Sequence, residues 1–221
     1  MTESIRKTFD EQLSDMQQEI VCMGSMVEQM VHHAIKALSE RDIELAERVI
    51  RMDDAVDDLD ISIEGRCMRM LALQQPVARD LRTIGTSMKI ITDLERMGDH
   101  AVDIAKLART LAEQPLFKPI VDIPKMAAVA QKMLRESLQA FVNRDIDLVQ
   151  KMVADDDAVD ALYRRIYDEI VDYMEKDPGI IRQAIILLRV ARFLERIADH
   201  ATNIGERVIF METGVLEELN I

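Results

Sequence analysis

The stretch that decides the fold occurs twice in the chain, as LERMGDHAVDI at residues 94–104 and as LERIADHATNI at residues 194–204. Each copy carries polar side chains at positions i, i+4 and i+8. On a helix with 3.6 residues per turn, such positions drift by only about 40° per step and therefore share one face. The two copies predict two long helices, each with a polar stripe, at matching places in two similar halves of the chain.

Each polar stripe lies in phase with the apolar face of its own helix. Before the first copy, apolar residues recur with a 3-4-3 spacing whose next member is Glu95: Leu81, Ile84, Met88 and Ile91. Glu195 follows a similar apolar series in the second half. A buried carboxylate without a partner would protonate, pair with a cation or bind a metal ion, so we expect a partner at both glutamates.

The composition is typical of a helical protein. The 221 residues include only seven glycines and five prolines, with no tryptophan, and 48% are hydrophobic. This is enough apolar material for one large domain or two small ones, and residues that favour helices dominate. The fold class that we predict is therefore all-α.

The charge and the ends of the chain exclude some classes of protein. The net charge is −13 and no lysine- or arginine-rich block stands out, so nucleic acids and anionic membranes should repel the chain. Residues 1–12 contain no apolar run of the signal-peptide type, and the longest strongly apolar stretch, 184–188, is too short to span a bilayer. We expect a cytoplasmic protein without a transmembrane segment, and the isolated Cys22 and Cys67 fit a reducing compartment.

The landmarks of the first half recur in the same order in the second. RDI at 41–43 recurs at 144–146, and DDAVD at 53–57 recurs at 156–160. Between the halves, Pro115, Pro119 and Pro124 form the densest cluster of helix breakers. We expect six helices: about 4–38, from an Asp42 cap to 74, from Pro76 to about 114, around 126–141, 146–173, and from an Asp177 cap and Pro178 onward.

This order predicts two tandem three-helix bundles related by an internal repeat. The first covers residues 1–114 and the second 125–213, with a Pro-rich linker at 115–124 and a C-terminal tail at 214–221. Each unit alone is too thin to bury both of its faces, so we expect the two to pack side by side about a pseudo-twofold axis.

A second acidic stripe lies on the middle helix of each half. In the first half it has 4-3-4 spacing and consists of Asp53, Asp57, Asp60 and Glu64. The fifth helix keeps Asp156 and Asp160 but has Tyr163 and Tyr167 at the next two places. Antiparallel packing would place these acids opposite the stripes that contain Glu95 and Glu195.

Two interpretations of the acids are open. Carboxylates on facing helices repel one another unless a cation lies between them, and hard oxygen ligands suit iron, manganese, magnesium or calcium, with zinc as a further candidate. Alternatively, the acids form salt bridges with Arg96, Arg196 and other arginines on a solvated face. His100 and His200 directly follow the acids and are candidate ligands or ordinary hydrogen-bonded residues.

At these residues the chain resembles the PhoU family over nearly its whole length. The similar segments are LALQQPVARDLR at 71–82, KIITDLERMGD at 89–99, DDAVDALY at 156–163 and ERIADHATNIGER at 195–207. The resemblance implies metal clusters, of iron or zinc, held by Asp53, Asp57, Glu95, Asp99, Asp103, Asp156, Asp160, Glu195, Asp199 and Asn203. Ala198 and Gly205 exchange one small residue of the family pattern for another. Because Tyr163, Tyr167 and Asn203 replace carboxylates, we expect the second site to bind cations more weakly than the first.

The resemblance also implies a function. It indicates a negative regulator of phosphate uptake and of the phosphate-starvation response, a homodimeric adaptor between the ATPase subunit of the phosphate ABC transporter and a sensor histidine kinase. Such a protein would be cytoplasmic and would reach the inner membrane through its partners. The sequence contains no nucleophile motif, Gly-rich phosphate loop or basic cleft, so we expect no enzymatic activity.

Two other classes remain as alternatives. Acids on facing helices of a bundle are also typical of ferritin-type di-iron oxidases and metal-storage proteins. That chemistry uses Glu-x-x-His pairs, whereas neither His100 nor His200 has a glutamate three residues before it. A purely structural helical spacer is the third possibility, and it would bind no metal.

Overall fold

The computed structural model describes residues 2–219, and the side chains of residues 7–219. Six long helices and one short 3₁₀ helix make up this part of the chain, without a strand. They are α1 (Thr2–Glu40), α2 (Ile43–Gln74), α3 (Ala78–Leu111), α4 (Asp122–Asn143), α5 (Ile146–Lys176), η1 (Pro178–Ile180) and α6 (Ile181–Thr213). The predicted all-α fold is confirmed.

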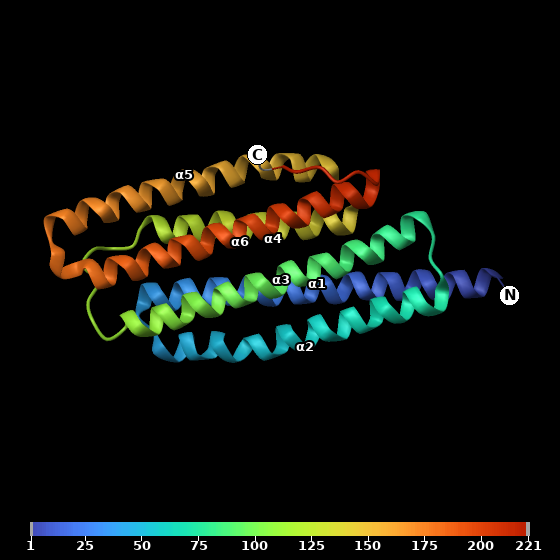
Figure 1. Cartoon of the computed structure of the whole chain (residues 1–221). Coiled ribbons are helices and arrows are strands. Elements are labelled where there is room, and N and C mark those ends of the chain that lie inside the picture. Colours follow the sequence, from blue (N-terminus) through green and yellow to red (C-terminus); the bar gives the residue numbers. More distant parts are fainter. Residues whose placement is uncertain (1, 220–221) are drawn as a thin grey trace.

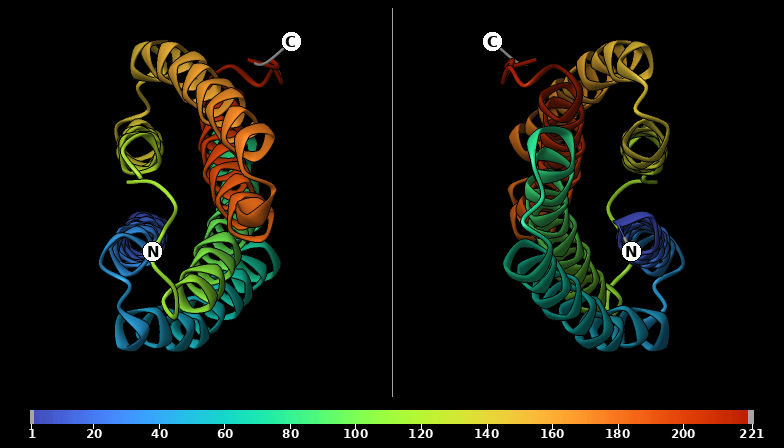
Figure 2. Two further views of the ribbon diagram at one scale, coloured as in Figure 1. Left: turned by 90° about the vertical axis from the view of Figure 1, so that its left-hand side faces the viewer. Right: turned by 90° about the vertical axis from the view of Figure 1, so that its right-hand side faces the viewer.

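The helices form two bundles of three. Helices α1, α2 and α3 pack on one another, and α4, α5 and α6 do the same, with α3 on α6 and α1 on α4 joining the two bundles. The helices run along the long axis of the molecule (Figure 1), and the view along them shows α3 beside α6 and α1 beside α4 (Figure 2). The internal repeat thus places α3 and α6, which carry the duplicated stretch, next to each other.

The repeated RDI segments form repeated turns. The Asp42 carboxylate accepts a hydrogen bond from the backbone N–H of Leu45, and Asp145 accepts one from Leu148, both at 2.9 Å. Each aspartate thereby caps the N-terminus of a helix, an arrangement typically worth about 1 kcal/mol. The turns and their capping residues lie where the sequence predicted them.

The start of α3 differs from the prediction. Pro76 does not open this helix, which begins at Ala78. Gln75 has a left-handed backbone with φ of 46°, and Val77 is extended with φ of −123°. A residue before proline avoids the right-handed helical region, so the chain leaves α2 at Gln75 and passes through an extended connection before α3 starts. The prediction for the sixth helix was closer, since the Asp177 side chain accepts from the Gly179 N–H and Pro178 opens η1.

The predicted apolar rows are largely in the core. Methionines fill much of it, and Met16, Met23 and Met30 of α1 are fully buried. Leu81, which the 3-4-3 spacing placed in the core, is instead 48% exposed. It lies in the first turn of α3, at the end of the bundle, where the helix is no longer covered on that face.

The connection between the bundles runs from 112 to 121 and is fastened to α5 and α6. The Phe117 N–H donates to Gln183 Oε1 at 3.2 Å, and the Phe117 ring packs edge-on against Tyr173 at 5.5 Å. Lys118 forms an ion pair with Glu169 and lies 5.6 Å from the Tyr173 ring centroid. Pro124, expected in the linker, lies in the first turn of α4, where a missing backbone N–H is tolerated.

The C-terminal tail is docked as far as the structure describes it. Gly214, with φ of 78°, ends α6, and its N–H donates to Phe210 O at 2.8 Å. The Leu219 N–H then donates to Glu206 Oε1 at 2.8 Å. In the described range, no helix combines the length and the apolar character that crossing a bilayer requires.

Candidate functional site

The acidic stripes of α2 and α3 meet, as the sequence predicted. Asp53 of α2 lies over Gly98 of α3: a Cβ placed on Gly98 would be 3.6 Å from Asp53 Oδ1 and 3.5 Å from Val56 Cγ1. We call the set formed by the two stripes the first acidic face, made of Asp53, Asp57, Asp60, Glu64, Glu95, Asp99 and Asp103. The small residue at 98 allows α2 to approach α3 closely at the centre of this face.

Burial, and then the charges of neighbouring carboxylates on both helices, raise the pKa values of acids on the first acidic face. Burial, assisted by the charges of Asp57 and Asp99 and opposed by Lys106, raises the pKa of Asp53 to about 6. Burial also raises the pKa of Glu95, with a contribution from Asp99 and smaller ones from Asp57 and Asp60 on the facing helix. Negative charge is therefore concentrated between α2 and α3.

Basic residues on the same helices offset part of this charge. Arg96 Nη1 lies 3.1 Å from Asp99 Oδ2, and Arg96 Nε lies 3.4 Å from Glu95 Oε2. Lys106 Nζ lies 3.8 Å from Asp103 Oδ1. The side chains of Arg96 and Lys106 are more than half exposed, so these pairs contribute little stability and leave the carboxylates available to a stronger cation.

The second half repeats the arrangement with α5 and α6. Its acids, Asp156, Asp160, Glu195 and Asp199, form what we call the second acidic face. Burial raises the pKa of Asp199 and of Glu195, and the Asp160 charge on α5 adds to both. Thr202 Oγ1 donates to Asp156 Oδ1 at 3.4 Å, which also brings α6 to α5.

Arginines also pair with the carboxylates of the second acidic face. Arg192 forms an ion pair with Glu195, whose side chain is only 14% exposed, and Arg164 pairs with Asp160 at 3.0 Å. The sequence had suggested Arg196 for this role, but the ion pair of Glu195 is with the residue three positions before it. The salt-bridge interpretation therefore describes part of both faces.

Three predicted ligand candidates point to the boundary between the halves instead. His200 Nδ1 lies 2.9 Å from Asp93 Oδ1, and Asn203 Nδ2 donates to the same oxygen at 3.3 Å. The His100 ring lies 5.6 Å from that of His200 and stacks on Phe193 at 5.4 Å. The structure thus places His100, His200 and Asn203 between α3 and α6.

The sequence patterns did not identify Asp93 as a residue that contacts the candidate site. The repeat offset of 100 residues pairs it with Phe193, so the same position is acidic in one half and aromatic in the other. This mismatch inside an otherwise similar stretch was the available signal. The structure explains it, because Asp93 contacts His200 while Phe193 contacts His100.

The described side chains form no ready-made metal site. In the part of the chain that the structure describes, no group of three or more His, Cys, Asp or Glu side chains is arranged to hold a metal ion. The chemistry of the first acidic face nevertheless fits a hard cation, since it offers only carboxylate oxygens and the pKa values of Asp53, Asp60 and Glu95 are raised. These exposed or half-buried side chains would have to rotate before their oxygens could converge on an ion.

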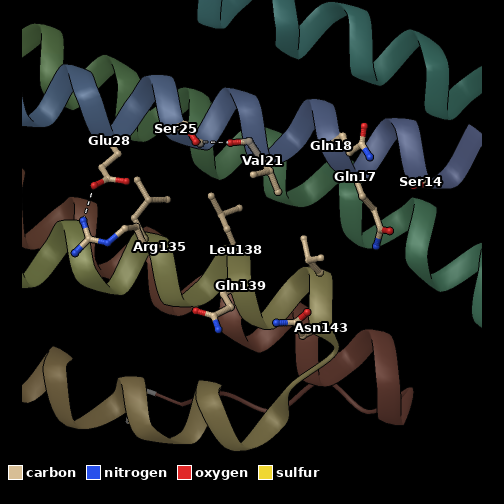
Figure 3. A pocket seen from close by; sticks show the side chains of 13 residues that line it. Ser14, Gln17, Gln18, Val21, Ser25, Glu28, Arg135, Leu138, Gln139 and Asn143 are labelled. Carbon is tan, nitrogen blue, oxygen red and sulfur yellow. Dashed lines mark hydrogen bonds and ion pairs between the residues drawn. The ribbon is translucent and has the colours of Figure 1, made fainter.

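A groove of about 590 Å³ lies between α1 and α4 (Figure 3). Gly24 allows the close contact at its floor, because a Cβ there would lie 2.1 Å from Leu138 Cδ1. The rim is made of uncharged polar side chains such as Gln17, Gln139 and Asn143, and its only charged lining residues, Glu28 and Arg135, pair with each other. The groove therefore offers no free cation to an inorganic phosphate.

The fold and these two faces define a class: an internally duplicated, all-helical protein with a carboxylate-lined face in each three-helix half. The family model described as the PhoU domain matches twice, at residues 20–108 and 123–208, one match per bundle. The chain belongs to the PhoU family.

The chain matches known relatives and solved structures over nearly its whole length. The chain is 40% identical to the phosphate-specific transport system accessory protein PhoU homolog of Clostridium acetobutylicum, over 97% of this chain and 99% of that protein. It is 42% identical to the homolog of the same description from Aquifex aeolicus, over 94% of each. The crystal structure of PhoU from Pseudomonas aeruginosa matches with a TM-score of 0.89 and 37% identity, covering 94% of this chain and 100% of that one. The phosphate transport system regulatory protein PhoU from Streptococcus pneumoniae matches with a TM-score of 0.88 and 33% identity, over 95% and 99%.

Proposed function

We propose that this protein is a negative regulator of phosphate uptake and of the phosphate-starvation response, acting as a non-enzymatic adaptor in the cytoplasm. The observation that carries the proposal is the end-to-end match, with both PhoU domains present, to relatives described as accessory proteins of the phosphate-specific transport system. Its partners would be the ATPase subunit of the phosphate ABC transporter and a sensor histidine kinase, and the protein would act as a homodimer.

The metal-binding part of the proposal rests on the two acidic faces. In the first face, the carboxylates of five residues would hold the ion or ions: Asp53, Asp57, Glu95, Asp99 and Asp103. The second face would use Asp156, Asp160, Glu195 and Asp199. Iron or zinc is the expected metal, with manganese or magnesium as further candidates. A bound cation would offset the burial and the mutual repulsion that together raise the pKa values of Asp53 and Glu95.

Deletion of the gene tests the regulatory role. In the deletion strain we expect phosphate uptake to rise and starvation genes to be expressed in phosphate-rich medium. Uptake of radiolabelled phosphate and a starvation-promoter reporter measure both effects, and re-expression of the chain should reverse them. Normal uptake and normal reporter activity in the deletion strain would show that the proposal is wrong.

The oxidase alternative makes a different prediction. A ferritin-type site needs histidine beside the carboxylates, and here His100 and His200 lie against each other, Phe193 and Asp93. Among the residues that the structure describes, no contact favours oxidase chemistry, so we do not propose it. Rapid oxygen consumption on addition of ferrous iron to the purified protein would reverse this choice.

A further inference from the structure

The α2–α3 turn exposes an apolar surface that the fold does not use. Leu73 in the last turn of α2 is 76% exposed, Val77 before α3 is 74% exposed, and Leu81 in the first turn of α3 is 48% exposed. We call these three residues the α2–α3 tip. The turn lies at one end of the elongated molecule, near the N-terminus (Figure 1).

The corresponding turn in the second half is also apolar and lies at the opposite end (Figure 1). There Tyr173, Ile181 and Ile185 are exposed and belong to α5 and α6. Scattered exposed apolar residues are ordinary, but three large ones grouped at a turn, in both copies of a repeat, are the kind of patch that partners cover.

The two turns differ in charge. Residues 66–82 contain four arginines, one aspartate and no lysine or glutamate, for a net charge of +3 in a chain whose total is −13. The corresponding residues 169–182 contain four acids, one lysine and one arginine, for a net charge of −2. Two of the four arginines pair with acids of other helices, Arg66 with Glu19 and Arg79 with Glu212. Arg69 and Arg82 therefore carry the positive charge beside the apolar surface of the α2–α3 turn, and the other turn has no such excess.

The α2–α3 turn is held in place before any partner binds. Arg82 Nε donates to Met211 O at 3.0 Å, and Arg79 Nη2 lies 3.0 Å from Glu212 Oε2, which ties the start of α3 to the end of α6. A surface that is already ordered loses little conformational entropy on binding.

A hollow of about 230 Å³ adjoins the tip between α1 and α2. Leu73 and Met70 give it apolar walls, and Arg66 and Arg69 give it cationic ones. Arg66 is already paired with Glu19 at 2.7 Å, whereas Arg69 is exposed on the rim. The hollow therefore suits a side chain with an apolar stem and a carboxylate end.

We propose that the α2–α3 tip and Arg69 form a docking surface for a partner protein whose contacting surface is apolar and edged with carboxylates. This inference rests on the proposed function, in which the partner is a component of the phosphate transport machinery. A protein is favoured over a lipid surface because the total charge of −13 opposes approach to an anionic bilayer and because the hollow accommodates an individual side chain.

Binding to the purified phosphate ABC transporter in nanodiscs of neutral phosphatidylcholine tests the inference. Leu73→Asp with Val77→Asp should weaken binding by about tenfold or more, because central apolar contacts dominate interface energies. Arg69→Glu should weaken it by roughly threefold to tenfold and reduce its salt dependence. The matched control is Ile181→Asp with Ile185→Asp at the opposite turn, which should leave binding unchanged. Circular dichroism and thermal unfolding verify that all variants are folded.

Each outcome decides one question. If the unaltered chain and the tip variants bind the transporter equally, the docking surface is wrong and the proposed function stands. If the unaltered chain does not bind the transporter, the adaptor role fails and the inference fails with it. If empty nanodiscs of phosphatidylglycerol bind the chain as well as the transporter does, and the tip variants abolish this, the occupant is a bilayer and the protein partner is wrong.

Discussion

Removing the charge of Asp53 should stabilise the metal-free protein, although the residue is a predicted ligand. Burial and the neighbouring Asp57 and Asp99 raise the pKa of Asp53 from 3.8 to about 6, so the folded state disfavours its ionised form. Unscreened, this shift would correspond to roughly 3 kcal/mol. Asp53 is only half-buried, and solvent screening reduces the effect to about 1 kcal/mol. In EDTA at pH 7.5, Asp53→Asn should therefore raise the melting temperature by roughly 2–4 °C.

The pH dependence of stability tests independently whether the charge of Asp53 stabilises or destabilises the folded state. Because the pKa is higher in the folded state, that state binds more protons than the unfolded one between pH 3.8 and about 6, and stability falls as the pH rises through this window. The advantage of Asp53→Asn should thus vanish near pH 4 and reach its full size above pH 6. Urea unfolding at a series of pH values measures it, with the exposed Asp58→Asn on the same helix as the control. A variant that is less stable than the parent at pH 7.5 without metal would refute the electrostatic reasoning.

Four further predictions concern the two acidic faces, two glycines at helix contacts and the ion pairs of Glu212. In calorimetric titrations with iron or zinc, Glu95→Ala with Asp99→Ala should remove the tighter binding phase, and Glu195→Ala with Asp199→Ala the weaker one; the reverse pattern would invert the ranking of the two faces. Gly205→Ala should destabilise the protein by about 1–3 kcal/mol, since its Cβ would lie 2.8 Å from Val149 Cγ1 and 2.9 Å from Met152 Cε. Gly98→Ala, whose Cβ would lie 3.5 Å from its nearest neighbour, Val56 Cγ1, should be neutral or stabilising by up to about 1 kcal/mol. Thermal melts measure both glycine variants. Glu212→Gln weakens the ion pairs that join Arg79 of α3 and Arg144 after α4, and urea unfolding should show a loss of about 1 kcal/mol; an unchanged midpoint would mean that these pairs contribute nothing.

Periodicity predicted the helices and the faces that meet within each half. Helical spacing determines which residues share a face, so Glu95 and Glu195 were expected on the apolar side, and their side chains are indeed only 27% and 14% exposed. The Asp42 and Asp145 caps were predictable because capping depends on residues three positions apart.

Contacts between the halves could not be predicted in this way. Whether His200 faces Asp160 or Asp93 depends on how α6 lies against α3, which helical spacing alone does not determine. Leu81 shows the same limit, since its spacing is that of a core residue and only the end of the bundle leaves it exposed. Pro76 was assigned to α3 because proline is common at the first position of a helix, but the backbone of Gln75 and Val77 makes it part of the connection.

The fastened linker restricts which motions are open to the protein. A ten-residue connection would ordinarily let two bundles rotate freely relative to each other. Here Lys118 and Phe117 anchor the connection to Glu169, Tyr173 and Gln183. Swinging one bundle away from the other would first break those contacts and then separate α3 from α6. A change at either acidic face should therefore be transmitted as a small slide or rotation of one long helix against its neighbour. A hinge motion that opens the two bundles is not expected.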